Sequence, residues 1–210
     1  MFKFEKLVFG DLGWGDEFLF ATLMTITVSI LSMGLGLCLA IITVWAKLIS
    51  SRLTRFIANL YTTVVRGVPE LLVIYLIFFG GNSVVMGIAK LFGYNGYIEL
   101  NALTIGTIAI AFISATYSSE VIRAAYLSVN KGQVEAAKAL GLKKFHIFLR
   151  VMGPQIIRHA LPGIGNVWQI TLKDTSLISV TGLVEIMRQS RIASNVEHSP
   201  LTFLVTAAFL

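Results

Sequence analysis

The sequence is poor in cysteine and in charge. Its one cysteine, Cys38, excludes an intrachain disulfide framework and a metal cluster held by several thiolates. Charged residues make up only 13% of the chain, whereas soluble domains carry roughly 25%. Together with 56% hydrophobic residues and a mean hydropathy of +0.80, this excludes a soluble globule and a disordered chain. The composition indicates a protein of the lipid bilayer.

Uncharged stretches predict where the chain crosses the membrane. A helix needs about 20 apolar residues to span the hydrocarbon, and three stretches of about that length, between residues 18 and 119, contain no charge. A fourth is interrupted by Lys173 and Asp174, and a fifth is too short to span, so we expect the natural polypeptide to continue beyond it. The expected spans are about 18–46, 57–80, 100–125, 156–184 and 201–210.

The basic residues indicate how these spans are oriented. Most of them follow the first and the third expected span, and by the positive-inside rule these two segments face the cytoplasm. The N-terminus is then outside and the C-terminus cytoplasmic. This orientation accounts for the net charge of +6, so membrane lipid is an expected partner and nucleic acid is not. Without a Pro/Ser-rich linker or a repeat, we predict one all-α integral membrane domain over 1–210.

The most informative segment runs from Gln133 to Gly141, within an expected cytoplasmic loop of about 130–154. Its alanines predict a compact helix that another backbone can approach closely, and Gly141 is a natural helix stop. The segment is too polar to cross a membrane. It is therefore a short cytoplasmic helix, either a docking element or a solvated connection between two spans.

The spacing of this segment resembles the EAA loop of ABC-importer permease subunits, a Glu-Ala-Ala triplet followed by a glycine and, further on, by an aliphatic residue, Leu and Pro. Gly153 stands where leucine is usual. Further blocks that begin at Arg66, Tyr117 and Ala160 are similar to the polar-amino-acid branch, the histidine and octopine permease group. The resemblance covers about 21–210. It implies a type I importer permease of about five transmembrane helices with a cytoplasmic coupling helix, in a bacterial inner membrane.

The resemblance also implies partners. These are a second permease subunit, in a homodimer or heterodimer, two cytoplasmic ATPase subunits and a periplasmic solute-binding protein. The chain contains no Gly-x-x-x-x-Gly-Lys-Ser/Thr loop, which cradles ATP phosphates, so we expect ATP and Mg on the partner ATPase and no cofactor here. Pro154 would restart the next span. The implied coupling residues are Glu135, Ala136, Ala137, Leu140, Gly141 and Pro154.

Charged residues inside a span are costly and therefore suggest a function. Lys173 and Asp174 interrupt the fourth span beside Thr175 and Ser176, and an unwound break of this kind can line a cavity. The pair offers a cation and an anion to a zwitterionic amino acid. The alternative is structural, as a mutual ion pair or a contact to the second permease subunit.

A second group of candidates lies in the second and third spans. Arg66 and Glu70 are four residues apart, so they either form an intrahelical salt bridge or flank a kink at the intervening Gly and Pro. The resemblance implies that such a kink lines the solute path, with Glu70 near a positively charged solute group. Tyr117 and Ser118, near the inner end of the third span, are further candidates.

Other classes of protein are less well supported. The three histidines show no ligand spacing, so we predict no metal site, and no clustered nucleophile, acid and base suggests catalysis. A gradient-driven secondary amino acid transporter is the alternative, although it has no use for a docking helix. We therefore predict the permease subunit of an ATP-driven, binding-protein-dependent importer for a polar, first of all basic, amino acid or an opine.

Overall fold

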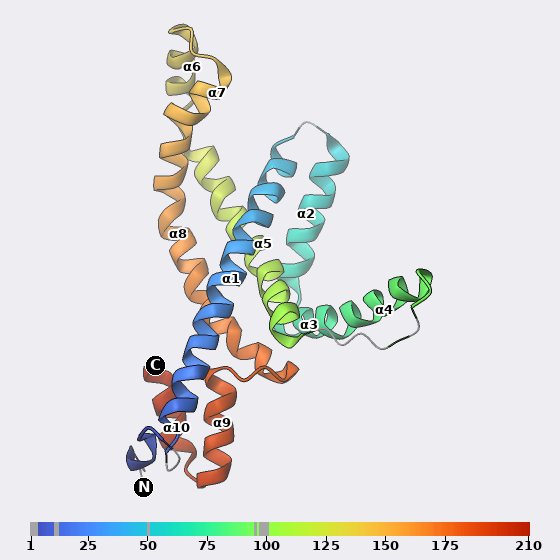
Figure 1. Cartoon of the computed structure of the whole chain (residues 1–210). Coiled ribbons are helices and arrows are strands. Elements are labelled where there is room, and N and C mark those ends of the chain that lie inside the picture. The colour runs from blue at the N-terminus through green and yellow to red at the C-terminus, as the bar shows by residue number, and fades with distance from the viewer. Residues whose placement is uncertain (1–3, 11–12, 50, 95, 97–100) are drawn as a thin grey trace. The chain divides into compact units, whose positions relative to one another are not determined.

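A computed structural model of the chain describes residues 4–10, 13–49, 51–94, 96 and 101–210. These residues form helices and turns and contain no strand (Figure 1), so the all-α prediction is confirmed. The helices are η1 (Phe4–Leu7), α1 (Gly15–Leu48), α2 (Arg52–Gly67), α3 (Glu70–Tyr75), η2 (Leu76–Gly80), α4 (Gly81–Leu91), α5 (Ala102–Ser128), α6 (Lys131–Ala139), α7 (Lys144–Ile147), η3 (Phe148–Met152), α8 (Gly153–Asp174), η4 (Thr175–Thr181), α9 (Ile186–Glu197) and α10 (Pro200–Phe209).

Three helical segments among the described residues are long and apolar enough to cross a membrane. They are α1, the continuous stretch Glu70–Leu91 that joins α3, η2 and α4, and α5. α10 is a shorter apolar helix. Leu100, with which the expected third span begins, lies outside the described residues.

The expected second span of 57–80 is divided in the structure. α2 ends at Gly67, Val68 and Pro69 are extended, and α3 begins at Glu70. Proline lacks an amide N–H and disfavours helical backbone in the residue before it, so the helix ends here. Arg66 and Glu70 thus lie on different helices. The helix is therefore interrupted at the intervening Gly and Pro, and a salt bridge within one helix is not formed.

The chain forms two compact units, which do not follow the order of the spans. The first contains 1–32, 69–110 and 171–210, and the second contains 33–68 and 111–170. Because α1 contributes to both units, no linker separates them. The assignment of one domain over 1–210 stays a prediction.

The first unit is built around two small apolar clusters. In one, the Phe18 and Phe203 rings stack with centroids 6.0 Å apart, and Ala193 completes the cluster. α9 and α10 run side by side in this region (Figure 1). In the other, Ile178 packs against α5 so closely that a Cβ on Gly106 would lie 2.6 Å from its side chain. A larger residue at Gly106 would therefore force the Ile178 side chain to move.

The second unit brings helices together at small residues. A Cβ on Gly36 of α1 would overlap the Ser114 hydroxyl of α5, so this glycine allows the close packing typical of membrane helices. The Tyr61 hydroxyl of α2 donates a hydrogen bond of 2.6 Å to the Phe112 carbonyl of α5. α1, α2 and α5 therefore form one packed group within this unit.

Candidate functional site

The predicted coupling helix is α6, which begins and ends with well-defined caps. The Asn130 side chain accepts a hydrogen bond of 2.8 Å from the Gly132 amide at the N-terminus. At the C-terminus, the Gly141 amide donates to the Lys138 carbonyl and the Leu142 amide to the Ala137 carbonyl, which is the Schellman pattern. Gly141 has a φ of +76°, so glycine is favoured at this stop.

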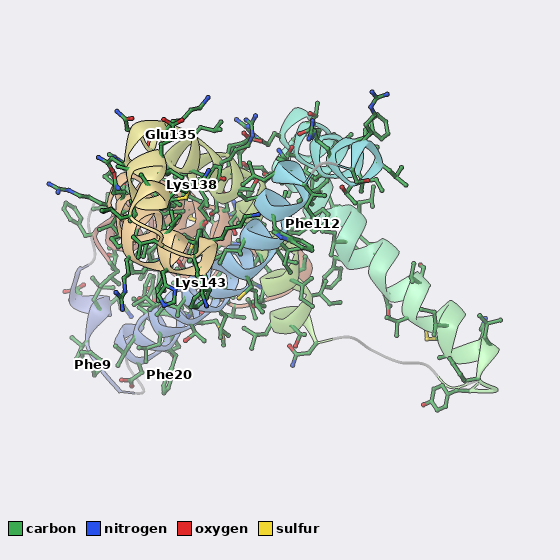
Figure 2. The ribbon with its side chains drawn as sticks, turned by 90° about the horizontal axis from the view of Figure 1, so that it is seen from above. Phe9, Phe20, Phe112, Glu135, Lys138 and Lys143 are labelled. Atoms are coloured by element: carbon green, nitrogen blue, oxygen red, sulfur yellow. The ribbon has the colours of Figure 1, made fainter. Side chains whose placement is uncertain are left out.

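The two alanines of the triplet face different surroundings. Ala137 is buried, whereas Glu135, Ala136 and Leu140 are exposed, Leu140 by 82%. Figure 2, seen from above, shows the side chains of Glu135, Lys138 and Lys143 in the region of α6 and the start of α7. Ala136 and Leu140 therefore present the accessible apolar surface of α6, and Ala137 packs inward.

Pro154 does not restart a span in the structure. The helix has already begun at Lys144, continues through the π-helical turn η3 and passes into α8 at Gly153. Because proline cannot donate to the carbonyl four residues earlier, the wider turn immediately before it accommodates the missing hydrogen bond. Gln155 ties this region to α6 through a hydrogen bond of 2.6 Å from its Nε2 to Gln133 Oε1.

The predicted break in the fourth span occurs at the expected residues. α8 ends at Asp174 and continues as the tighter 3₁₀ helix η4. The hydroxyls of Thr175 and Ser176 donate to carbonyls three residues earlier, those of Leu172 and Lys173, at 2.7 and 2.8 Å. These hydroxyls therefore satisfy backbone carbonyls at the point where the α-helical pattern ends.

Two carboxyl groups meet at this break, within the first unit. Asp174, only 8% exposed, hydrogen-bonds through its side chain to Glu70, which is half-buried at the start of α3. Lys173 is exposed and forms no ion pair among the described residues. The mutual Lys173–Asp174 ion pair is thus not formed. The site combines Glu70 and Asp174, two acids from distant parts of the sequence.

The remaining candidates lie in the second unit. The Arg66 guanidinium stands 5.3 Å from the centroid of the Tyr117 ring, within the range of a cation–π interaction. Ser118 is fully buried, and its hydroxyl has no hydrogen-bond partner in the described part of the chain. Arg66 and Tyr117 are therefore brought together, while Ser118 has no surface that a solute could reach in this conformation.

Sequence reasoning did not identify Lys47 as a partner of Glu120. Glu120 pairs with Arg123 at 3.6 Å, as their spacing of three residues predicts, but it also pairs with the buried Lys47 of α1. Lys47 in turn donates a hydrogen bond of 2.7 Å to the Thr62 hydroxyl of α2. In the sequence, Lys47 is one of several basic residues near a loop. No local spacing pattern connects it to a residue of α5.

A second missed residue is Glu185, which is fully buried. Its carboxylate accepts hydrogen bonds of 2.8 and 2.7 Å from the amides of Met187 and Arg188 and so caps α9. Acidic caps are favoured at helix N-termini, and the position just before Ile186 could have suggested this role.

The apolar helices and the short polar helix α6, the predicted coupling helix, fit one class of protein, a membrane subunit of a solute importer. The model of the family described as "Binding-protein-dependent transport system inner membrane component" matches residues 32–210. The chain belongs to this family. It is therefore a permease subunit of an ABC importer, and the gradient-driven secondary transporter finds no support.

Individual relatives agree with this assignment. The nopaline transport system permease protein NocQ of Agrobacterium fabrum is 50% identical over 202 residues, covering 96% of this chain and 86% of the relative. The octopine permease OccQ of Rhizobium meliloti is 45% identical over 206 residues, covering 98% and 87%. The histidine/lysine/arginine/ornithine permease HisQ of Escherichia coli is 34% identical over 198 residues, covering 94% and 86%.

A solved structure shares the fold. The crystal structure of an amino acid ABC transporter with histidines superposes with a TM-score of 0.78 at 29% identity, covering 93% of this chain and 86% of that chain. The type I importer fold predicted from the sequence is thereby confirmed.

Proposed function

We propose that this permease subunit imports a basic amino acid or an opine and that Glu70 and Asp174 contact a cationic group of the solute. The supporting observation is the meeting of the two carboxyl groups at the break in the fourth span. Two carboxyl groups that share a site repel each other when both are ionised, and a cation beside them relieves that repulsion. An acidic pair in this position favours a positively charged solute group.

The relatives support the same class of solute. Their names include octopine, nopaline and the group histidine, lysine, arginine and ornithine. Lys173, exposed and next to Asp174 in the sequence, offers a cation for the carboxylate that every amino acid carries. The pair and Lys173 thus match both charges of the solute.

Coupling to ATP hydrolysis is assigned to α6. Its exposed Glu135, Ala136 and Leu140 offer a carboxylate beside a small apolar surface, which suits docking in a groove of a cytoplasmic ATPase subunit. That ATPase subunit binds ATP and Mg. A second permease subunit completes the path, two ATPase subunits drive it, and a periplasmic binding protein delivers the solute. The chain then has its N-terminus outside.

The solute assignment is tested by uptake of radiolabelled arginine in cells that express the whole importer with Asp174→Asn or Glu70→Gln. We expect the apparent affinity to fall about tenfold in each, because a hydrogen bond to a charged group contributes roughly 1.5–3 kcal/mol. Glu17→Gln, which removes an exposed acid near the start of α1, serves as the control. Unchanged affinity in both pair variants would contradict the proposal.

The coupling assignment has its own test. Glu135→Lys reverses the charge at the docking surface, and Gly141→Pro removes the amide that donates to Lys138 and disfavours the left-handed backbone of the stop. Both variants are expected to reach the membrane and to lose transport, with the ATPase no longer co-purifying or no longer stimulated by solute. Normal transport in both would show that α6 is only a connection.

A further inference from the structure

A polar cavity of about 490 Å³ lies in the second unit, lined by α1, α2 and α5. Small-molecule sites occupy roughly 300–1,000 Å³, so the cavity is large enough for a chemical group of moderate size. Its charged lining residues are Lys47, Arg66 and Glu120, and Asn59 and Thr63 add polar groups. The proposed contacts of Glu70 and Asp174 with the solute do not involve this cavity, although Arg66 and Tyr117 in its lining were candidates for the solute path.

The charges around the cavity do not balance. Both oxygens of the Glu120 carboxylate are engaged, one by Lys47 and the other by Arg123 at 3.6 Å. Arg66 is a third cation; it stacks on Tyr117 and forms no ion pair with any residue that the structure describes. The lining therefore holds two cations and one carboxylate, and that carboxylate is also paired with Arg123 outside the lining. The excess positive charge would be balanced by an anion.

The cavity lies where the uncharged parts of two helices end. α1 carries no charge from residue 18 to 46, and Lys47 follows directly. α5 carries none before Glu120. Because charged side chains avoid the hydrocarbon, the first charge after such a stretch marks the depth at which lipid headgroups begin.

α2 carries an apolar row beside the polar lining. Leu53, Ile57, Leu60 and Val64 follow one another at intervals of three and four residues, and each is at least 50% exposed. This spacing places them along one side of the helix. Asn59, Thr63 and Arg66 lie on another side and line the cavity. A helix with these two faces suits a ligand that has a charged head and apolar chains.

We propose that the cavity binds the phosphate headgroup of an anionic phospholipid, with its acyl chains along the apolar row of α2. The Arg66 guanidinium presents paired N–H donors, which match phosphate oxygens. Asn59 and Thr63 supply further donors. Basic pockets between transmembrane helices at headgroup depth are suited to such lipids.

The test is native mass spectrometry of the complete importer, purified in mild detergent and supplied with phosphatidylglycerol or phosphatidylcholine of equal chain length. We expect preferential retention of phosphatidylglycerol. Arg66→Gln should lower this retention about fivefold, the effect of one cation near an anionic headgroup, and Arg66→Lys should recover most of it. Arg52→Gln, on the same helix but outside the lining, is the matched control and should leave retention unchanged.

Three results would overturn the proposal. Equal retention of the two lipids would show that the headgroup charge is not recognised. An equal loss in Arg66→Gln and Arg52→Gln would show only a general surface attraction. Displacement of the lipid by millimolar glycerol phosphate or arginine would assign the cavity to a soluble anion or to the solute itself. None of these measurements depends on transport. Their outcome is therefore independent of the uptake test of Glu70 and Asp174.

Discussion

Arg66 and Glu70 are four residues apart in the sequence, yet they serve chemically opposite sites. Glu70 belongs to the first unit and joins Asp174 in an acidic pair. Arg66 belongs to the second unit and lines a cavity in which cations outnumber the one carboxylate. The extended residues Val68 and Pro69 separate them. A short break in a span therefore lets neighbouring charges take part in different sites.

The two sites also differ in how their charges are compensated. In the basic cavity, Glu120 neutralises part of the positive charge from within the protein. In the acidic pair, the adjacent Lys173 forms no ion pair among the described residues. In the proposed function the solute neutralises the acidic pair, whereas the basic cavity is partly neutralised by the protein itself and would suit a resident ligand.

The largest effect is expected from reversing one charge of the acidic pair. Asp174→Lys would place a cation opposite Glu70, so that the protein itself fills the position of the solute cation. We expect arginine uptake to fall at least about 100-fold, as loss of a charged hydrogen bond combines with repulsion of the solute. Initial uptake rates at several arginine concentrations measure this. Uptake close to that of the natural protein would remove the pair from the solute path.

The next largest effect concerns the buried cation of the second unit. The Lys47 side chain is 3% exposed and its partner Glu120 is 32% exposed. Lys47→Met leaves the carboxylate with only Arg123, and we expect about 2 kcal/mol of destabilisation, below the roughly 3–5 kcal/mol for a fully buried pair. Thermal unfolding in detergent measures it. The double variant Lys47→Met/Glu120→Leu should regain much of the loss; an additive loss would argue against this pairing.

Much of this arrangement could be predicted from the sequence, because it depends on local rules. The break at Pro69, the stop at Gly141 and the end of α8 at Asp174 each follow from residues within one or two turns. The Lys47–Glu120 and Glu70–Asp174 contacts could not be predicted, since they join residues 73 and 104 positions apart. Such contacts depend on how the helices pack, which hydropathy and spacing alone do not determine.

A third variant removes the separation between the two sites. Pro69→Ala restores an amide N–H and allows α2 to continue toward α3, which would place Arg66 and Glu70 one turn apart on a single helix. An intrahelical salt bridge would then compete with both sites. We expect arginine affinity and retention of phosphatidylglycerol each to fall about threefold to fivefold. Val68→Ala, which keeps the proline, is the control. A change in only one of the two readouts would show that the break serves that site alone.

The smallest effect is expected from the exposed member of the basic cluster. Arg123 is 44% exposed and lies three residues after Glu120, and exposed pairs of this kind contribute roughly 0.2–1 kcal/mol. We therefore expect Arg123→Gln to lower stability by less than about 0.5 kcal/mol, well below the effect of Lys47→Met. High salt should abolish the small stability loss of Arg123→Gln but leave most of the loss of Lys47→Met. Salt screens an exposed ion pair far more than the pair with buried Lys47. Unfolding curves for the two variants, recorded at low and high salt, compare these contributions directly. If both lost the same stability and responded equally to salt, burial of Lys47 would not distinguish it from a surface cation.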